Sequence, residues 1–234
     1  GQDRLGGSVL AQVWNALGSI SPDVAPEDVI SFFELLSELK KREWLLAYHD
    51  RSDGGLLVTA LEMAFAGRCG LDIDIDVDLQ QAAARLFSEE VGALIQVDDK
   101  QVSEVMALAA QSGLKGAVSL VGKPRLDERI VVNTRQFELI DSRRAALQSL
   151  WSETSHAIAR LRDNAACADA EFEAIKQSDR GLSASLTYDC DEDVAAPMIA
   201  TGVRPRVAIL REQGVNGQME MAAAFSAAVT GVSS

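Results

Sequence analysis

Residues 44–78 read WLLAYHDRSDGGLLVTALEMAFAGRCGLDIDIDVD, and their pattern changes three times. The apolar run at 44–49 predicts a short buried strand, and DRSDGG after it predicts a loop. The apolar stretch at 56–67 predicts a helix that ends at its glycine. From 71 to 78, isoleucine or valine alternates with aspartate, which indicates a strand with one buried face. A strand, a loop, a helix and a second strand therefore follow one another closely.

The alternation of helices and strands continues on both sides of this stretch. Helices are predicted at 8–18, 30–39, 80–87 and 100–113, and strands at 91–97 and twice within 117–132. This order predicts a layered α/β or α+β domain over 1–142.

A different organisation is expected after residue 142. A long helix is predicted at 143–162, followed by an acidic, extended linker to residue 203. RVAIL at 206–210, the loop EQGVNG and an apolar helix then predict the start of a Rossmann-like domain over 204–234. We expect this last domain to be incomplete, because one strand and one helix cannot bury both faces of the strand.

Composition limits the classes of partner. The 234 residues include 35 acidic and 22 basic ones, for a net charge of −13. Nucleic acid is not expected as a partner, because its binding rests largely on Lys and Arg. No apolar run approaches the roughly 20 residues of a membrane helix, so no membrane partner is expected. Three scattered cysteines without a CxxC pair favour a reducing, cytoplasmic location over a disulfide framework. Small molecules, metal ions and protein surfaces remain as partners.

The loop at 50–55 is the first candidate site. It joins the end of a predicted strand to the start of a predicted helix, a place where α/β proteins bind ligands. Asp50 and Asp53 offer the carboxylate oxygens that Mg²⁺ prefers. Gly54 and Gly55 allow close approach of the backbone, and free N–H groups at the helix start suit phosphate. The spacing alone favours a turn that simply begins a helix.

Two further candidates admit the same pair of interpretations. LGGS at 5–8 opens the first predicted helix, either as a phosphate loop or as an ordinary capped start. Glu89 and Glu90 are neighbouring carboxylates, which serve acid–base chemistry or, more commonly, structure. The sequence favours the structural interpretation for both.

Two other patterns are set aside. The aspartates of the alternating strand suggest a calcium loop, but Val77 and Ala83 stand where an EF-hand requires Gly and Glu. A solvated strand face is predicted instead. His156 and Cys167 lack an evident orienting group, so no nucleophilic pair is assigned.

Several segments together carry a resemblance to a known family. In order, they are LGGSVLAQ, HDRSDGGLLVTALEMAFAG, LFSEEVGALIQV, WSETSHAIARLRDN and RPRVAILREQGVNGQMEMAAAF. HDRSDGG with SEEVGALIQV resembles the wider ATP-binding superfamily that includes aminoimidazole ribonucleotide synthetase. The whole set resembles the large single-chain formylglycinamide ribonucleotide amidotransferases.

The resemblance implies a function and a set of site residues. The family uses ATP, Mg²⁺ and glutamine to make formylglycinamidine ribonucleotide, ADP, phosphate and glutamate. Residues 1–142 would be a C-terminal-type domain of the synthetase half, similar to that of aminoimidazole ribonucleotide synthetase. Asp50 matches the family's metal ligand and Ser52 its nucleotide contact, while Gly54 and Gly55 match motif glycines.

The same resemblance limits what this chain is expected to do alone. The glutaminase nucleophile and its partners would lie beyond the REQGVN segment, so no catalytic residue is assigned and no turnover by this chain is expected. The expected partners are nucleotide, ribonucleotide substrate, and the N-terminal and glutaminase domains of the same enzyme. A non-catalytic module that holds ADP with Mg²⁺ and docks other domains is the alternative.

Overall fold

The computed structural model describes residues 2–18, 20–178, 181–194, 196–202 and 206–230. The chain divides into two compact units, Gly1–Asp179 and Arg180–Ser234. Within the described ranges, no helix combines the length and the apolar character needed to cross a membrane.

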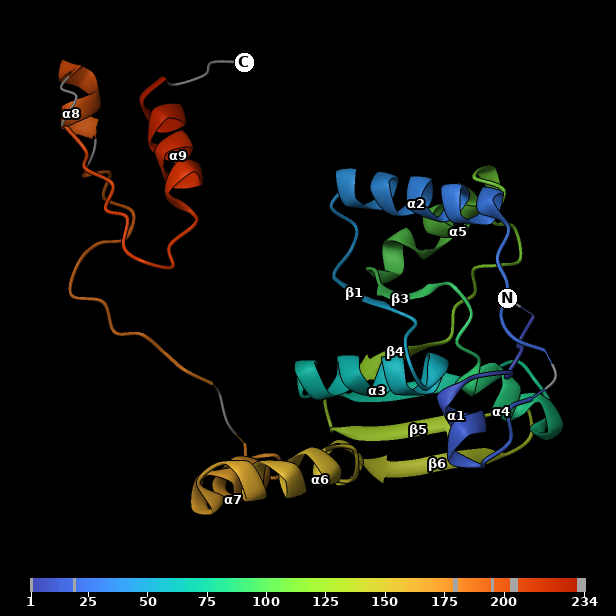
Figure 1. The fold of residues 1–234 in the computed structure, drawn as a ribbon. Helices are drawn as coiled ribbons and strands as arrows, with labels where there is room; N and C mark the ends of the chain where they lie inside the picture. Colours follow the sequence, from blue (N-terminus) through green and yellow to red (C-terminus); the bar gives the residue numbers. More distant parts are fainter. Residues whose placement is uncertain (1, 19, 179–180, 195, 203–205, 231–234) are drawn as a thin grey trace. The chain divides into compact units, whose positions relative to one another are not determined.

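Two sheets organise the first unit (Figure 1). The larger has the strand order β4-β2-β5-β6; β2 and β5 run parallel, and the other neighbours run antiparallel. Its strands are β2 (Gly70–Asp74), β4 (Gly122–Arg125), β5 (Arg129–Asn133) and β6 (Glu138–Arg143). The smaller sheet pairs β1 (Ala47–Asp50) with β3 (Ala93–Gln96) in antiparallel register.

Two helices, α3 (Gly55–Gly67) and α4 (Leu79–Phe87), cover one face of the four-stranded sheet (Figure 1). The alternating stretch after residue 70 turns its apolar side chains to these helices, and Ile73, Ile75 and Val77 are all buried. Ile130 and Val132 of β5 are fully buried beside them. Burial of each such side chain contributes about 1.5–3 kcal/mol. This shared core fixes where α3 begins, and the candidate loop lies directly before it.

The opposite face of that sheet is polar, as predicted. Arg125 lies 2.6 Å from the Asp72 carboxylate, and Asn133 donates to Asp74 at 3.1 Å. Arg129 and Asp141 form a further cross-strand pair. The aspartates therefore stabilise the sheet surface through neighbouring polar groups, which confirms the prediction of a solvated strand face.

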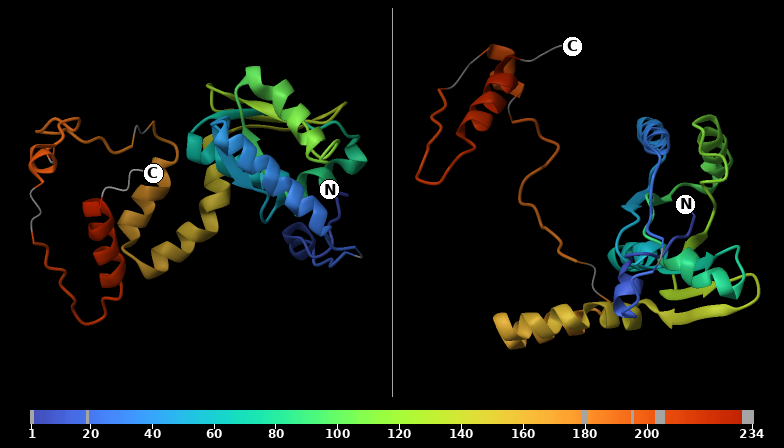
Figure 2. Two further views of the ribbon diagram at one scale, coloured as in Figure 1. Left: turned by 90° about the horizontal axis from the view of Figure 1, so that it is seen from above. Right: turned by 45° about the vertical axis from the view of Figure 1, so that its right-hand side comes forward.

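A second, smaller core lies between α2 (Pro26–Lys41) and α5 (Val102–Gln111), which run side by side (Figure 2). Its buried members are Leu35, Leu39, Val105, Ala109 and Leu114. The 3-10 helix η1 (Asp99–Gln101) leads into α5. Partly buried side chains of β3, among them Ile95, pack against this cluster, so β1 and β3 lie between the two cores.

The segment after the sheet differs in part from its prediction. The long helix is confirmed as α6 (Arg144–Arg162), but α7 (Ala165–Ala174) occupies the start of the predicted extended linker. The Asn164 side chain caps α7, and His156 of α6 stacks on Phe172 of α7 with ring centroids 4.2 Å apart. A local cap and a packed aromatic pair thus make a helix where acidic composition alone indicated a linker.

Arg144 ties this helical pair to the sheet. Its side chain is 2% exposed, lies 2.7 Å from the Glu128 carboxylate and donates to the Ile175 carbonyl at 3.3 Å. Both helices consequently belong to the first unit. The boundaries expected at 142 and 203 remain predictions.

Other differences concern short elements. The first helix, α1, spans only Val9–Val13, because Asn15 and Gly18 take positive φ and the chain folds back so that Leu17 accepts from the Gly7 N–H. Strand β6 was not predicted. In the second unit, α8 (Ala196–Thr201) and α9 (Gln218–Thr230) are present, whereas 206–210 forms no strand. The predicted strand is wrong for this chain, since the described part of the unit offers it no strand as a partner.

Candidate functional site

The four predicted site residues lie in one tight connection between β1 and α3. Asp50 is the last residue of β1, and Gly55 is the first of α3. The turn is closed by the Gly55 N–H, which donates to the Ser52 carbonyl at 2.9 Å. Arg51 N–H donates to the Gly92 carbonyl at 2.8 Å and anchors the turn beside β3. The structure therefore brings the predicted residues together.

The two glycines are required by packing. Gly54 and Gly55 have φ values of 83° and 67°, a region that side chains disfavour. A Cβ on Gly55 would lie 2.7 Å from the Leu86 carbonyl oxygen, and one on Gly54 would lie 2.3 Å from a Val58 methyl group. The start of α3 therefore sits directly against the backbone at the end of α4. Neither fact depends on a ligand.

Asp50 and Ser52 differ from the glycines because their side chains are accessible. Asp50 is exposed, and its carboxylate accepts a hydrogen bond from the Tyr48 hydroxyl. Burial and, after it, this carboxylate raise the pKa of Tyr48 to about 12. Among the described residues, the Ser52 hydroxyl has no hydrogen-bond partner. Two side chains with oxygen atoms thus remain available at the mouth of the turn.

Neighbouring side chains hold the backbone of Asp50 and Ser52 through hydrogen bonds. The Thr59 hydroxyl, fully buried, donates to the Asp50 carbonyl at 3.4 Å and accepts from the Ser52 N–H at 3.4 Å. The His49 ring lies 2.9 Å from the Glu62 carboxylate and 2.7 Å from the Asp50 carbonyl. No sequence pattern marked Thr59, which supports the turn from within α3.

LGGS, the second candidate, lies next to the same turn. Glu89 connects the two: one carboxylate oxygen accepts the N–H of Val9, at the start of α1, and the N–H of Gly54, both at 2.9 Å. Ser8, 1% exposed, caps α1 through its side chain. The predicted ordinary capped start is therefore confirmed for Ser8.

Glu90 holds the chain before LGGS. It is 3% exposed and accepts hydrogen bonds from the Gln2 N–H, the Arg4 N–H and the Arg4 guanidinium. Burial opposes ionisation of Glu90, yet these hydrogen bonds leave its pKa lowered. Both glutamates thus make structural contacts, in agreement with the structural interpretation from sequence.

The nearby Arg51 guanidinium is half-buried, and burial lowers its pKa. The carboxylates of Asp3 and Glu90 act against that shift. The positively charged Arg51 side chain is therefore held beside the turn, on the side of the N-terminal segment.

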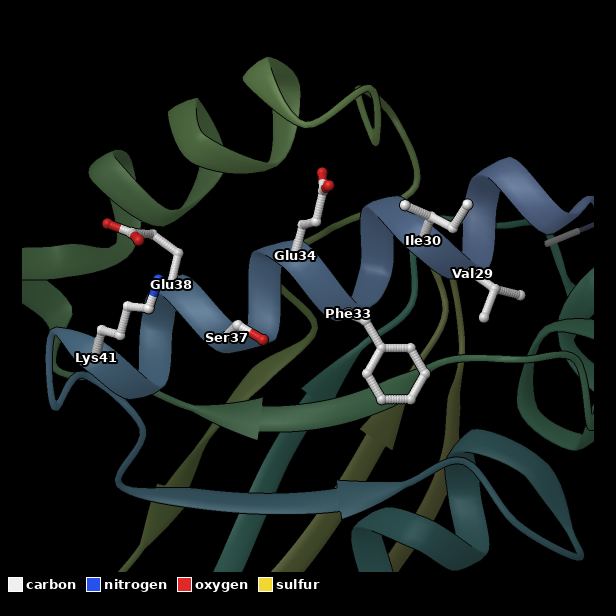
Figure 3. A pocket seen from close by; sticks show the side chains of 7 residues that line it. All are labelled: Val29, Ile30, Phe33, Glu34, Ser37, Glu38 and Lys41. Carbon is white, nitrogen blue, oxygen red and sulfur yellow. The ribbon is translucent and has the colours of Figure 1, made fainter.

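The remaining candidates lie apart from the turn. His156 pairs with Asp169 at 2.8 Å, and within the described residues no hydrogen bond joins it to Cys167. A shallow hollow runs along α2 and contains none of the predicted site residues (Figure 3). Its lining is Val29, Ile30, Phe33, Glu34, Ser37, Glu38 and Lys41.

The turn at 50–55 combines features that suit an anion with features that suit a metal cation. The N-cap Gly54 has no side chain of its own, and its N–H already donates to the Glu89 carboxylate at 2.9 Å, so the dipole of α3 is the feature that favours an anion there. The exposed Asp50 carboxylate beside it suits a hard divalent cation. A phosphate with its metal ion would satisfy both.

A family model matches the first part of the chain, and several solved structures are similar to it. Residues 1–132 match the family described as AIR synthase related protein, C-terminal domain. Among solved structures, Thermotoga maritima PurL complexed with ATP is similar with a TM-score of 0.47 and 17% identity, over 53% of this chain and 22% of that one. The same protein complexed with FGAR gives 0.43 and 17%, over 50% and 20%.

A HypE–HypF complex is similar with a TM-score of 0.43 and 17% identity, over 59% of this chain and 48% of that one. This chain therefore spans about a fifth of the PurL chains and about half of the HypE–HypF chain that it resembles.

Proposed function

This chain belongs to the family of AIR synthase related C-terminal domains, and from that premise we propose that its turn at 50–55 forms part of a site for ATP or ADP with Mg²⁺. The observation behind the proposal is the juxtaposition at one turn of an exposed carboxylate, an available serine hydroxyl and the N-terminus of α3, whose N-cap is a glycine without a side chain. Each group has its own task toward a metal-bound nucleotide.

Asp50 would serve as a ligand of Mg²⁺ through its carboxylate oxygen. The Ser52 hydroxyl would donate to a phosphate oxygen, and the dipole of α3 would favour the negative charge. Gly54 and Gly55 would contribute by letting α3 begin close to the end of α4. Mg²⁺, when bound, would offset phosphate charge.

The complete protein would be an ATP-dependent carbon–nitrogen ligase of purine biosynthesis, with glutamine as the amide donor. The ordered set of segments from LGGSVLAQ to REQGVNG supports this finer proposal. Formylglycinamide ribonucleotide would be the substrate, and an N-terminal and a glutaminase domain would complete the enzyme in the cytoplasm. Residues 204–234 would begin that glutaminase domain.

Titration of Mg–ADP into isotope-labelled chain, followed by NMR, tests the nucleotide site. The amides of Ser52, Gly54 and Gly55 should shift together and saturably, and Asp50→Asn should remove the dependence of these shifts on Mg²⁺. Asp99→Asn, an exposed aspartate of η1, is the matched control and should change neither. Shifts confined to other segments, or no shifts at millimolar nucleotide, would contradict the proposal.

A further inference from the structure

Glu89 connects two segments that are far apart in the sequence. Its Oε1 accepts the N–H of Val9 and the N–H of Gly54, each at 2.9 Å. Val9 is the first residue of α1, directly after LGGS, and Gly54 is the N-cap of α3. A single carboxylate oxygen thus satisfies one unpaired N–H at the start of each helix.

The backbone around Glu89 is itself held in place. Ser88 before it is fully buried, and Glu90 after it is 3% exposed and bound to the N-terminal segment. The end of α4 packs so closely on Gly55 that no side chain fits there. The Glu89 side chain therefore extends from a fixed base toward two fixed N–H groups, and its length matters.

We propose that Glu89 is a positioning residue for the nucleotide site. It couples LGGS at 5–8 to the turn at 50–55 and so sets the place of the turn relative to α1. The inference rests on the proposed function in one respect: the expected consequence of the coupling is that nucleotide is retained. It goes beyond that function in assigning the geometry of the site to a side chain outside both glycine-rich segments.

The chemistry of the contact separates this role from a simple effect of charge. A glutamine oxygen can accept both N–H groups at the same reach, although hydrogen bonds to a charged acceptor are stronger. An aspartate keeps the charge but is one methylene shorter, so it cannot span both contacts from a fixed backbone. If Glu89 instead acted by repelling phosphate, loss of its charge would tighten binding.

The test compares Glu89→Gln, Glu89→Asp and Glu89→Ala with the wild-type chain. Glu104→Ala, at an exposed glutamate of α5, controls for the loss of one negative charge. Hydrogen exchange of the Val9 and Gly54 amides is measured without nucleotide, and Mg–ADP affinity is measured by NMR titration. In Glu89→Asp and Glu89→Ala, both amides should exchange about tenfold faster, the scale of a lost hydrogen bond to a charged group.

The same two variants should bind Mg–ADP several-fold more weakly, whereas Glu89→Gln and Glu104→Ala should stay near wild type in both measurements. Unchanged exchange at Val9 and Gly54 in Glu89→Asp, or tighter nucleotide binding in Glu89→Gln, would overturn the proposal. If Glu89→Ala does not fold, the Gln and Asp variants decide. A wild-type chain that binds no Mg–ADP would overturn the proposed function alone, because exchange reports the coupling without nucleotide.

Discussion

Gly55→Ala is expected to destabilise the first unit strongly, through packing rather than through loss of a ligand contact. Gly55 has a φ of 67°, and a Cβ there would lie 2.7 Å from both the Leu86 carbonyl oxygen and the Phe87 carbonyl carbon. These are backbone atoms, which cannot turn away as the end of a side chain can. Either α3 or the end of α4 must therefore move.

The magnitude has two parts. A non-glycine residue in the left-handed region costs about 1–2 kcal/mol, and forced overpacking typically costs about 1–3 kcal/mol. Gly116 provides the matched control, because its φ is 81° and a Cβ there would meet nothing within 4 Å. Gly116→Ala should show the first cost only. The entropy that alanine removes from the unfolded chain is common to both variants and cancels in their difference.

Urea unfolding followed by tryptophan fluorescence measures the difference. All three tryptophans, Trp14, Trp44 and Trp151, lie in the first unit, so the signal reports that unit. Gly55→Ala should have a free energy of unfolding about 1–3 kcal/mol lower than Gly116→Ala. Equal stability of the two variants would refute the packing argument and return Gly55 to the group of residues that need a ligand to explain them.

Two further predictions concern ion pairs of the same unit. Hydrogen bonds from the Arg125 side chain and then from a backbone N–H lower the pKa of Asp127 to about 2, from an ordinary 3.8. The stabilisation from this pair is therefore complete above pH 3.8 and is lost as the pH falls toward 2. In an NMR titration, Arg125→Gln should move the midpoint of the Asp127 carboxyl up toward 3.8. An unmoved midpoint would argue against the pairing. Arg144→Ala should lower the free energy of unfolding by about 2 kcal/mol, less than for a fully buried pair because the Glu128 partner is 40% exposed. It should also speed amide exchange in α7. Unchanged exchange in α7 would show that Arg144 does not hold this helix in place.

The predicted elements that proved right are those whose pattern is repeated over several residues. The stretch at 71–78 alternates strictly; its first half forms β2, which ends at Asp74, and its apolar residues Ile73, Ile75 and Val77 are all buried. The apolar helix before it is found as α3, with only one residue added at its start. In these segments, local periodicity and tertiary burial require the same conformation.

The elements that were missed depend on contacts between distant residues. Strand β6 pairs with β5 and carries the polar sequence ELIDSR, whose local pattern does not mark a strand. Helix α7 is held by Phe172 against His156 and by an Asn164 cap. Composition favoured a linker there because acidic residues are common in linkers, and the deciding contacts lie outside the segment.

The candidate site shows the same division. The turn at 50–55 could be found from its residues, since a strand, two glycines and a helix follow in sequence. The link from Glu89 to Val9 and Gly54 could not, because it joins three segments through a side chain whose sequence context indicates only a pair of carboxylates. The sequence favoured a structural role for Glu89 and Glu90, and their contacts agree with it. The contacts of Glu89 add that its structural role lies at the candidate site.

The glycines and the polar residues of the turn consequently support the proposed function to different degrees. Gly54 and Gly55 are explained by positive φ and by close packing against Val58 and the end of α4, with or without a ligand. Their presence in a motif therefore indicates the fold of the turn rather than its chemistry. Asp50 and Ser52 are different, because their exposed or half-buried side chains do little to hold the turn together. If residues 50–55 bind a metal-bound nucleotide, variants of these two should lose binding while keeping stability, and variants of the glycines should lose stability first.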